Sequence, residues 1–122
     1  MRLTFTIAGP PVPKARARVT RFGGTYTPAK TRAYETHVGT CAMAARLATR
    51  GWVRTAHYRV ALDVYREHRR GDLDNYAKSV IDGCNSILWD DDRQIRDLRV
   101  VLHDCADDGS APRVEVAIEV LP

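Results

Sequence analysis

The chain has 122 residues, of which 44% are hydrophobic and 28% are charged, and its formal net charge is +4. This composition excludes a disordered or fibrous protein, and the length predicts a single domain over residues 1–122. No apolar run approaches the roughly 20 residues of a membrane span. The three cysteines are far apart, which argues against a disulfide framework. Because the first residues alternate in polarity instead of forming a signal-peptide core, we expect a cytoplasmic protein that does not contact a membrane.

Charge is divided unevenly along the chain. Residues 1–70 contain 14 Lys and Arg against 3 Asp and Glu (net +11), whereas residues 71–122 contain 5 against 12 (net −7). A basic half indicates a polyanionic partner, and a clustered acidic half indicates either a solvated surface or a cation site. Surface charge also drifts along ordinary sequences, but an imbalance of this size favours nucleic acid as the partner.

The first quarter of the chain combines a strand, a proline-rich turn and a hairpin. Residues 3–7 alternate between apolar and polar side chains and predict a half-buried strand, which the prolines of residues 10–13 end. In residues 14–18 three cations occupy alternate positions, so an extended chain would point them to one side. The glycine pair at residues 23–24 predicts the tip of a hairpin.

Two stretches have the apolar spacing of a helix. Thr27 as N-cap and Pro28 in the first turn begin the first, which we expect over about residues 28–49. The second is expected from about residue 75 to residue 88.

Three further strands are predicted. Residues 58–64 and 113–120 alternate strictly, whereas residues 95–104 suit a more buried strand. The turn at residues 107–110 would join the last two as a hairpin. The sum is a small α+β domain, a mixed or mainly antiparallel sheet packed with two helices.

The most informative stretch is acidic and surrounds the second helix. Asp72 and Asp74 are two residues apart at the end of an extended segment, so both carboxylates would face the same way, and Lys78 follows one helical turn later. Carboxylates without nearby His or Cys pairs favour Mg²⁺, with Mn²⁺ as a substitute, and a third carboxylate from residues 90–92 would complete the site. A lysine beside the metal would stabilise charge that develops on a phosphate.

Each of these residues also has a structural interpretation. Asp74 is a suitable N-cap for the second helix, Asp72 a turn residue after a glycine, and Lys78 a solvated partner of Asp74 or Asp82. The three aspartates at residues 90–92 would then form a polar loop, and Asp82 is more consistent with a structural role than with metal binding. The whole spacing, DxDNxxKxxxD followed by WDDD, is far more specific than one DxD pair.

At these residues the sequence resembles the RusA family of Holliday-junction resolvases. The likeness rests on the segments 70–75 and 89–95 with Lys78 and Asp82, and on the proline-rich turn, and it extends over nearly the whole chain. The resemblance implies a RusA-like fold and a small, homodimeric, Mg²⁺-dependent crossover junction endodeoxyribonuclease, often encoded by phages or prophages. It implies paired nicks in strands of like polarity at a four-way DNA junction, in recombination and repair.

Carried over by motif, Asp72, Asp74 and Asp92 would bind the metal, and Lys78 would be the essential lysine. The family turn usually has two aspartates, and this chain has three. Counting back from Gln94 favours Asp92 as the ligand, with Asp91 beside it.

The basic half supplies candidates for phosphate contacts, which position DNA without recognising its bases. They are Lys14, Arg16, Arg18, Arg21, Lys30, Arg32, Arg69 and Arg70. Phe22 or Tyr26 at the hairpin tip is suited to stack on an unpaired base, although packing under the turn is the more ordinary role for either ring. The four histidines show no ligand spacing, and both tryptophans suit the core or its edge.

Other functions stay open at this stage. One is a branched-DNA-binding module without catalysis, whose acidic turn is structural. Another is a nuclease that acts on other branched replication or packaging intermediates. A DxD enzyme that uses a metal–nucleotide, such as a glycosyltransferase, is disfavoured because the chain is short and has no Gly-rich phosphate loop.

Overall fold

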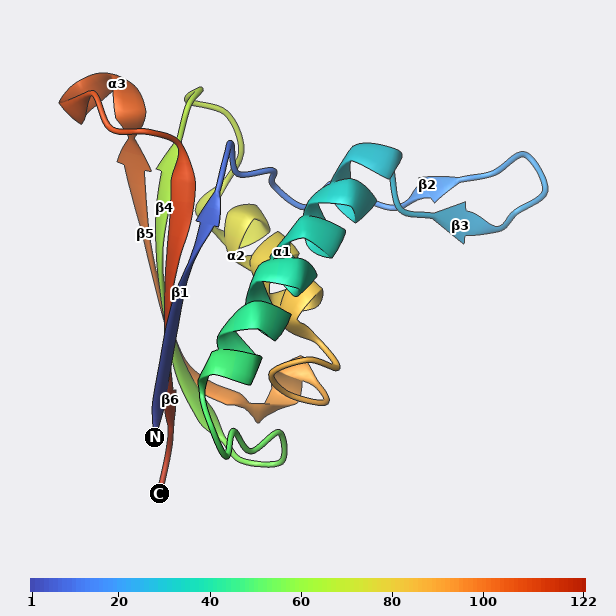
Figure 1. Cartoon of the computed structure of the whole chain (residues 1–122). Coiled ribbons are helices and arrows are strands. Elements are labelled where there is room, and N and C mark those ends of the chain that lie inside the picture. The colour runs from blue at the N-terminus through green and yellow to red at the C-terminus, as the bar shows by residue number, and fades with distance from the viewer.

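The computed structural model describes all residues 1–122 and consists of a four-stranded sheet, a helical layer and a projecting hairpin (Figure 1). In spatial order, the strands of the sheet are β1 (Arg2–Ala8), β6 (Arg113–Val120), β4 (Tyr58–Arg66) and β5 (Ile95–Asp104). The helices are α1 (Ala29–Ala48), α2 (Leu73–Cys84) and the short α3 (Cys105–Asp108), with one 3₁₀ turn, η1 (Asp92–Gln94). The hairpin consists of β2 (Arg18–Val19) and β3 (Thr25–Tyr26).

The sheet is mixed. β6 lies between β1 and β4 and is antiparallel to both, whereas β4 and β5 are parallel neighbours. Parallel strands cannot be joined by a tight turn and need a crossover connection, which α2 provides here. This topology confirms the predicted α+β class.

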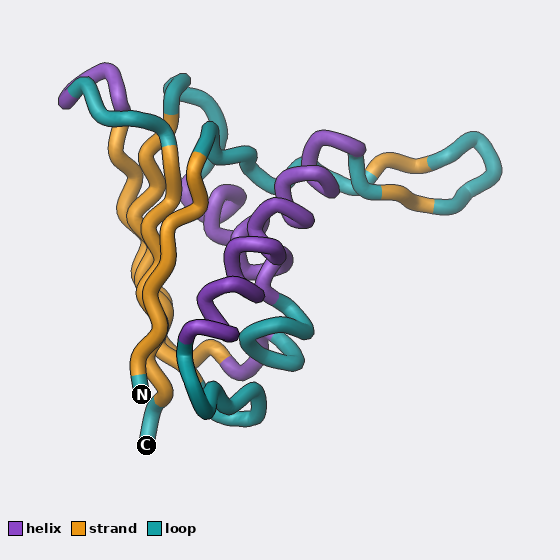
Figure 2. The backbone as a smooth tube through the Cα atoms, viewed as in Figure 1, coloured by secondary structure: helices purple, strands orange, loops and turns teal.

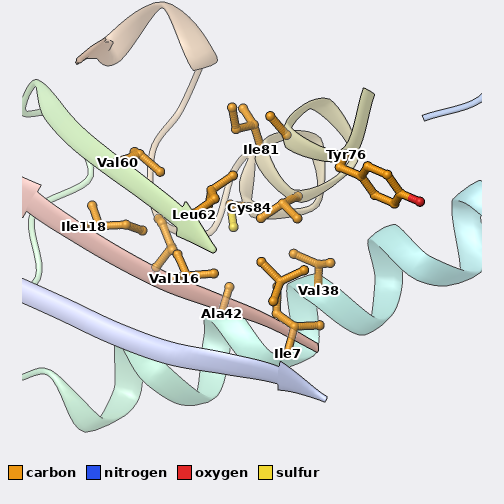
Figure 3. Close-up of a cluster of buried hydrophobic side chains, with 14 of the residues drawn as sticks. Ile7, Val38, Ala42, Val60, Leu62, Tyr76, Ile81, Cys84, Val116 and Ile118 are labelled. Carbon is orange, nitrogen blue, oxygen red and sulfur yellow. The ribbon is translucent and has the colours of Figure 1, made fainter. Parts of the chain in front are cut away.

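The hydrophobic core lies between one face of the sheet and the helices α1 and α2, which both cover that face (Figure 1). Alternation turns every second side chain of β4 and β6 inward, so that Leu62 and Ile118 are buried. Figure 3 shows them facing Val38 and Ala42 of α1 and Cys84 of α2. The core therefore fixes α2 against the sheet, and the polar side of α2 is left toward solvent.

The predicted hairpin between the last two strands is wrong. β4 lies between β5 and β6, so the segment that joins them must pass over the end of β4. It does so through α3, which ends at Gly109 in the left-handed conformation (φ 70°). A turn signal shows that the chain reverses, but it does not show which strand occupies the next place in the sheet.

The strand at residues 95–104 is also less buried than predicted. β5 is at the edge of the sheet, its residues 96–99 are exposed, and Leu98 retains 45% of its accessible surface. Apolar composition alone suggested burial on both faces, but the position of a strand in the sheet decides how much of it is covered.

Helix α1 agrees with the prediction to within one residue at each end, but Pro28 and not Thr27 occupies the N-cap position. Helix α2 begins two residues earlier and ends four residues earlier than predicted. Its apolar spacing continues past the end because Leu88 and Trp89 pack into the core from a loop. Positive φ at Ser86 (68°) and a bond from its N–H to the Trp89 carbonyl (2.7 Å) form that loop.

The β2–β3 hairpin extends away from the rest of the molecule (Figure 2). Gly23 takes a positive φ of 84° at the tip, as the glycine pair predicted. None of the helices is both long enough and apolar enough to cross a membrane.

Helices α1 and α2 approach closely at Gly83. A Cβ at this position would lie 2.7 Å from Val38 Cβ and 2.9 Å from the Glu35 carbonyl oxygen. We expect Gly83→Ala to lower the free energy of unfolding by about 1–3 kcal/mol, because overpacking outweighs the better helix propensity of alanine. Urea denaturation measures the change.

The matched control is Gly24→Ala, where the nearest atom to the new Cβ would be Thr20 Oγ1 at 3.4 Å. Its stability should stay within about 0.5 kcal/mol of the wild type. Equal stability of the Gly83 variant and the wild type would show that the helices do not cross this closely.

Candidate active site

One face of α2 carries three charged residues at successive turns. Asp74, Lys78 and Asp82 follow each other at intervals of four residues, so their side chains lie in a row along the helix. The opposite side of α2 is buried through residues such as Val80 and Cys84, which directs the row outward. The amphipathic pattern of α2 thus places one carboxylate on each side of a central lysine along the helix.

Lys78 is at the centre of this row. Its ammonium donates a hydrogen bond to Asp82 Oδ1 (3.1 Å) and lies 3.7 Å from Asp92 Oδ2. The bond to Asp82 raises the pKa of Lys78 above its ordinary value, against a smaller opposing effect of desolvation. Lys78 is therefore a protonated cation at neutral pH, and 52% of its side chain remains accessible to a ligand.

The three aspartates at residues 90–92, which we call the acidic turn, have three different partners. Asp90 forms an ion pair with Arg54 (2.6 Å). Asp91 caps η1, accepting the backbone N–H of Arg93 at 2.8 Å, and this bond lowers the pKa of Asp91. Asp92 alone lies beside Lys78. Asp92 is thus the aspartate beside Lys78, whereas Asp91 caps η1; which of them binds the metal stays a prediction.

Asp72 differs from Asp74 because the helix begins between them. Asp72 is the extended N-cap of α2, without a side-chain capping bond, and Asp74 is in the first helical turn. The prediction that both carboxylates project from one extended segment is therefore wrong, since alternation does not continue into a helix. The ligand role of Asp72 stays a prediction.

Within this chain, no three His, Cys, Asp or Glu side chains gather into a group that could hold a metal ion. Two shallow hollows flank Lys78, one lined by Asp74 and Leu98 and the other by Asp92 and Arg96. Mg²⁺ in proteins commonly uses only one or two carboxylates and completes its shell with water and phosphate oxygens. The oxygen donors beside Lys78 thus suit Mg²⁺ in chemistry, without forming a three-carboxylate cage.

The candidate DNA-binding cations fall into two groups. Lys14 is bound by Glu35 and Asp82, and Arg69 by Asp104 and Asp107. The other six form no ion pair, namely Arg16, Arg18, Arg21, Lys30, Arg32 and Arg70. Most of these six belong to residues 16–32, which we call the basic arm: the extended segment, the hairpin and the first turn of α1.

The hairpin tip is more exposed than expected. Phe22 keeps 86% of its accessible surface and Tyr26 keeps 48%, so the expectation that these rings pack under the turn is wrong. The Arg21 guanidinium lies 5.2 Å from the centre of the Phe22 ring. The basic arm therefore presents an aromatic ring among cations, which is the combination that binds unpaired bases.

Two residues at this site were not identified as functional from the sequence. Asp82 contacts both Lys14 and Lys78, and Glu35 of α1 contacts Lys14. The four-residue spacing of Lys78 and Asp82 was a visible signal for their pair, but no local pattern connects residue 14 with residue 82. His103 of β5 pairs with Asp63 of β4.

Comparison with known proteins connects this geometry to one family. The profile of a family described as "Endodeoxyribonuclease RusA" matches residues 8–119, which include the basic arm, α2 and the acidic turn. A search of curated proteins finds no match.

The different structural roles of Asp91 and Asp92 can be tested by measuring the thermal stability of variants. We expect Asp91→Ala to lower the melting temperature by a few degrees, because the cap of η1 is lost. Asp92→Ala should leave the melting temperature nearly unchanged, since its carboxylate is exposed and makes only a long ion pair. Differential scanning calorimetry measures both, and the reverse order of effects would contradict the assignment.

Proposed function

This chain belongs to the RusA family of endodeoxyribonucleases, and we propose that it is a Mg²⁺-dependent, structure-selective endonuclease that resolves four-way DNA junctions in recombination and repair. The observation that carries the proposal is the exposed Lys78 ammonium, which lies beside Asp92 and one helical turn from Asp74 on α2. Oxygen donors next to a lysine are the arrangement that metal-assisted phosphodiester hydrolysis requires.

In this proposal Asp74 and Asp92 hold the cation, with Asp72 as the third ligand. A bound Mg²⁺ supplies Lewis-acid polarisation of the phosphate and activation of water. Lys78 provides a positive charge where negative charge accumulates on the phosphate, and its exposure lets a DNA strand approach.

The basic arm is proposed to bind the junction. Its cations form no ion pairs within the chain, so they are available to phosphates, and Phe22 is exposed enough to stack on a base at the crossover. Lys30 and Arg70 line one hollow with the proline-rich segment, which extends the positive surface from the arm toward the start of α2.

We further propose that the active form is a homodimer. Paired nicks in strands of like polarity at a two-fold symmetric junction require two sites related by the same symmetry. The family resemblance supports this assembly.

Cleavage of a four-way junction tests the catalytic assignment. The wild type should nick the junction with Mg²⁺ and not without it. Asp74→Asn and Asp92→Asn should each lower the cleavage rate at least about 100-fold, with junction binding retained, because a metal ligand is lost. Denaturing gels measure cleavage and mobility shifts measure binding.

The matched control is Asp90→Asn, which changes a carboxylate in the same turn that pairs with Arg54 and does not contact Lys78. It should cleave at the wild-type rate. Binding without nicking by the wild type would identify a non-catalytic module. Equal cleavage of flaps and four-way junctions would favour a nuclease for other branched intermediates.

The salt dependence of junction affinity tests the basic arm. Each phosphate contact adds about 0.9 to the slope of log K against log salt, so replacing Arg16 and Arg18 by Gln should reduce the slope by about 2. Arg59→Gln is the control, since Arg59 is already paired with Asp97 and Glu119. A slope unchanged by the arm substitutions would exclude these arginines from the interface.

A further inference from the structure

The proline-rich segment before the basic arm is fastened to α2. The buried Ser79 hydroxyl donates to the Val12 carbonyl (2.7 Å), and the Lys14 N–H donates to the Asn75 carbonyl (2.8 Å). Pro13 packs so closely over Gly71 that a Cβ there would meet its ring at 3.0 Å. We call residues 10–14 the proline strap. It cannot shift without moving the helix that carries Asp74 and Lys78.

The strap places the Lys14 side chain between the helices. Its ammonium contacts Glu35 of α1 and lies 3.1 Å from Asp82 Oδ2 of α2. Partial burial disfavours the charged form of Lys14, but the bonds to Glu35 and Asp82 outweigh it and raise the pKa of Lys14. Lys14 is therefore already paired with carboxylates of its own chain, whereas the cations of the basic arm form no ion pair.

Asp82 is shared between two lysines, each on its own oxygen. Lys14 lies at Oδ2 and Lys78 at Oδ1, both at 3.1 Å. Because Lys14 occupies Oδ2, the carboxylate has a fixed orientation and offers a single oxygen to Lys78. An ammonium has three N–H donors, so Lys78 keeps donors free for a phosphate while its position is held.

We propose that Lys14 and Asp82 are positioning residues for Lys78, an inference that rests on the proposed nuclease function. Charges of alternating sign run from Glu35 through Lys14, Asp82 and Lys78 to Asp92. Without Asp82, the two lysines would repel each other and Lys78 would move. Without Lys14, Asp82 could turn and bind Lys78 through both oxygens, which would withdraw the ammonium from the substrate.

Single-turnover cleavage at saturating protein distinguishes positioning from DNA binding. Lys14→Met and Asp82→Asn should each lower the saturated rate about 10- to 100-fold and change the junction Kd less than about 3-fold, since small displacements of a catalytic group cost this much. Lys14→Arg, which keeps the charge, should recover most of the rate. The Lys14→Met/Asp82→Asn double variant should be at most about 3-fold slower than the slower of the two single variants, because the two residues act together.

Arg50→Met is the matched control, because it removes an exposed cation that forms no ion pair and lies outside the site; its rate and Kd should equal those of the wild type. Melting temperatures within a few degrees of the wild type would show that the variants fold. A Lys14→Met variant that binds more weakly but cleaves at the full saturated rate would make Lys14 a phosphate contact and overturn the inference.

A second measurement does not depend on cleavage. In protein labelled with ¹⁵N-lysine, without DNA or metal, the side-chain ammonium signal of Lys78 should shift or broaden in Lys14→Met and stay in place in Arg50→Met. An unchanged Lys78 signal in Lys14→Met would overturn the positioning role. If Lys14→Met shows the expected shift but the wild type never nicks a junction, the nuclease function is refuted while the contact between Lys14, Asp82 and Lys78 stays established.

Discussion

The carboxylate of Asp82 connects the parts of the molecule that meet at the candidate site. It receives Lys78 from its own helix and Lys14 from the proline strap, and Lys14 in turn binds Glu35 of α1. Ion pairs at the surface contribute little to stability when they stand alone. Here the strap supports these ion pairs. Its hydrogen bonds to α2 already hold the backbone of Lys14 in place, so forming the ion pairs costs less conformational entropy than it would for a lysine on a free surface segment.

The fold pairs some of the unevenly distributed charges of the sequence and leaves others without an ion pair. Several cations of the basic half pair with carboxylates of the acidic half, as Arg59 does with Asp97 and Arg66 with Asp104. Most of the candidate DNA-binding cations that are left without a partner belong to the basic arm. The net charge alone would suggest a diffuse positive surface. Arg16, Arg18, Arg21, Lys30 and Arg32, all in the basic arm, are among the cations that form no ion pair, and the hairpin of this arm projects away from the sheet (Figure 2).

Elements with a local sequence pattern were predicted correctly. The predictions failed where the burial of a strand depends on its position in the sheet. Strands β4 and β6 and helix α1 were predicted because alternation and helical spacing directly reflect burial on one side. The exposure of β5 was missed because its place at the sheet edge depends on the crossover through α2. The approach of the aspartate turn to Lys78 was anticipated from the motif, whereas the contact between Lys14 and Asp82 joins residues 68 positions apart that no periodicity relates.

The parallel pairing of β4 with β5 also has a consequence for the chain before it is fully folded. Contacts between distant residues form late because loop closure costs entropy, and this sheet closes only after α2 has crossed between the two strands. The arm is complete once the ribosome has produced the first third of the chain, while Asp92 arrives much later. The β2–β3 hairpin of the arm pairs residues that are close in sequence, so its formation does not wait for the closure of the sheet.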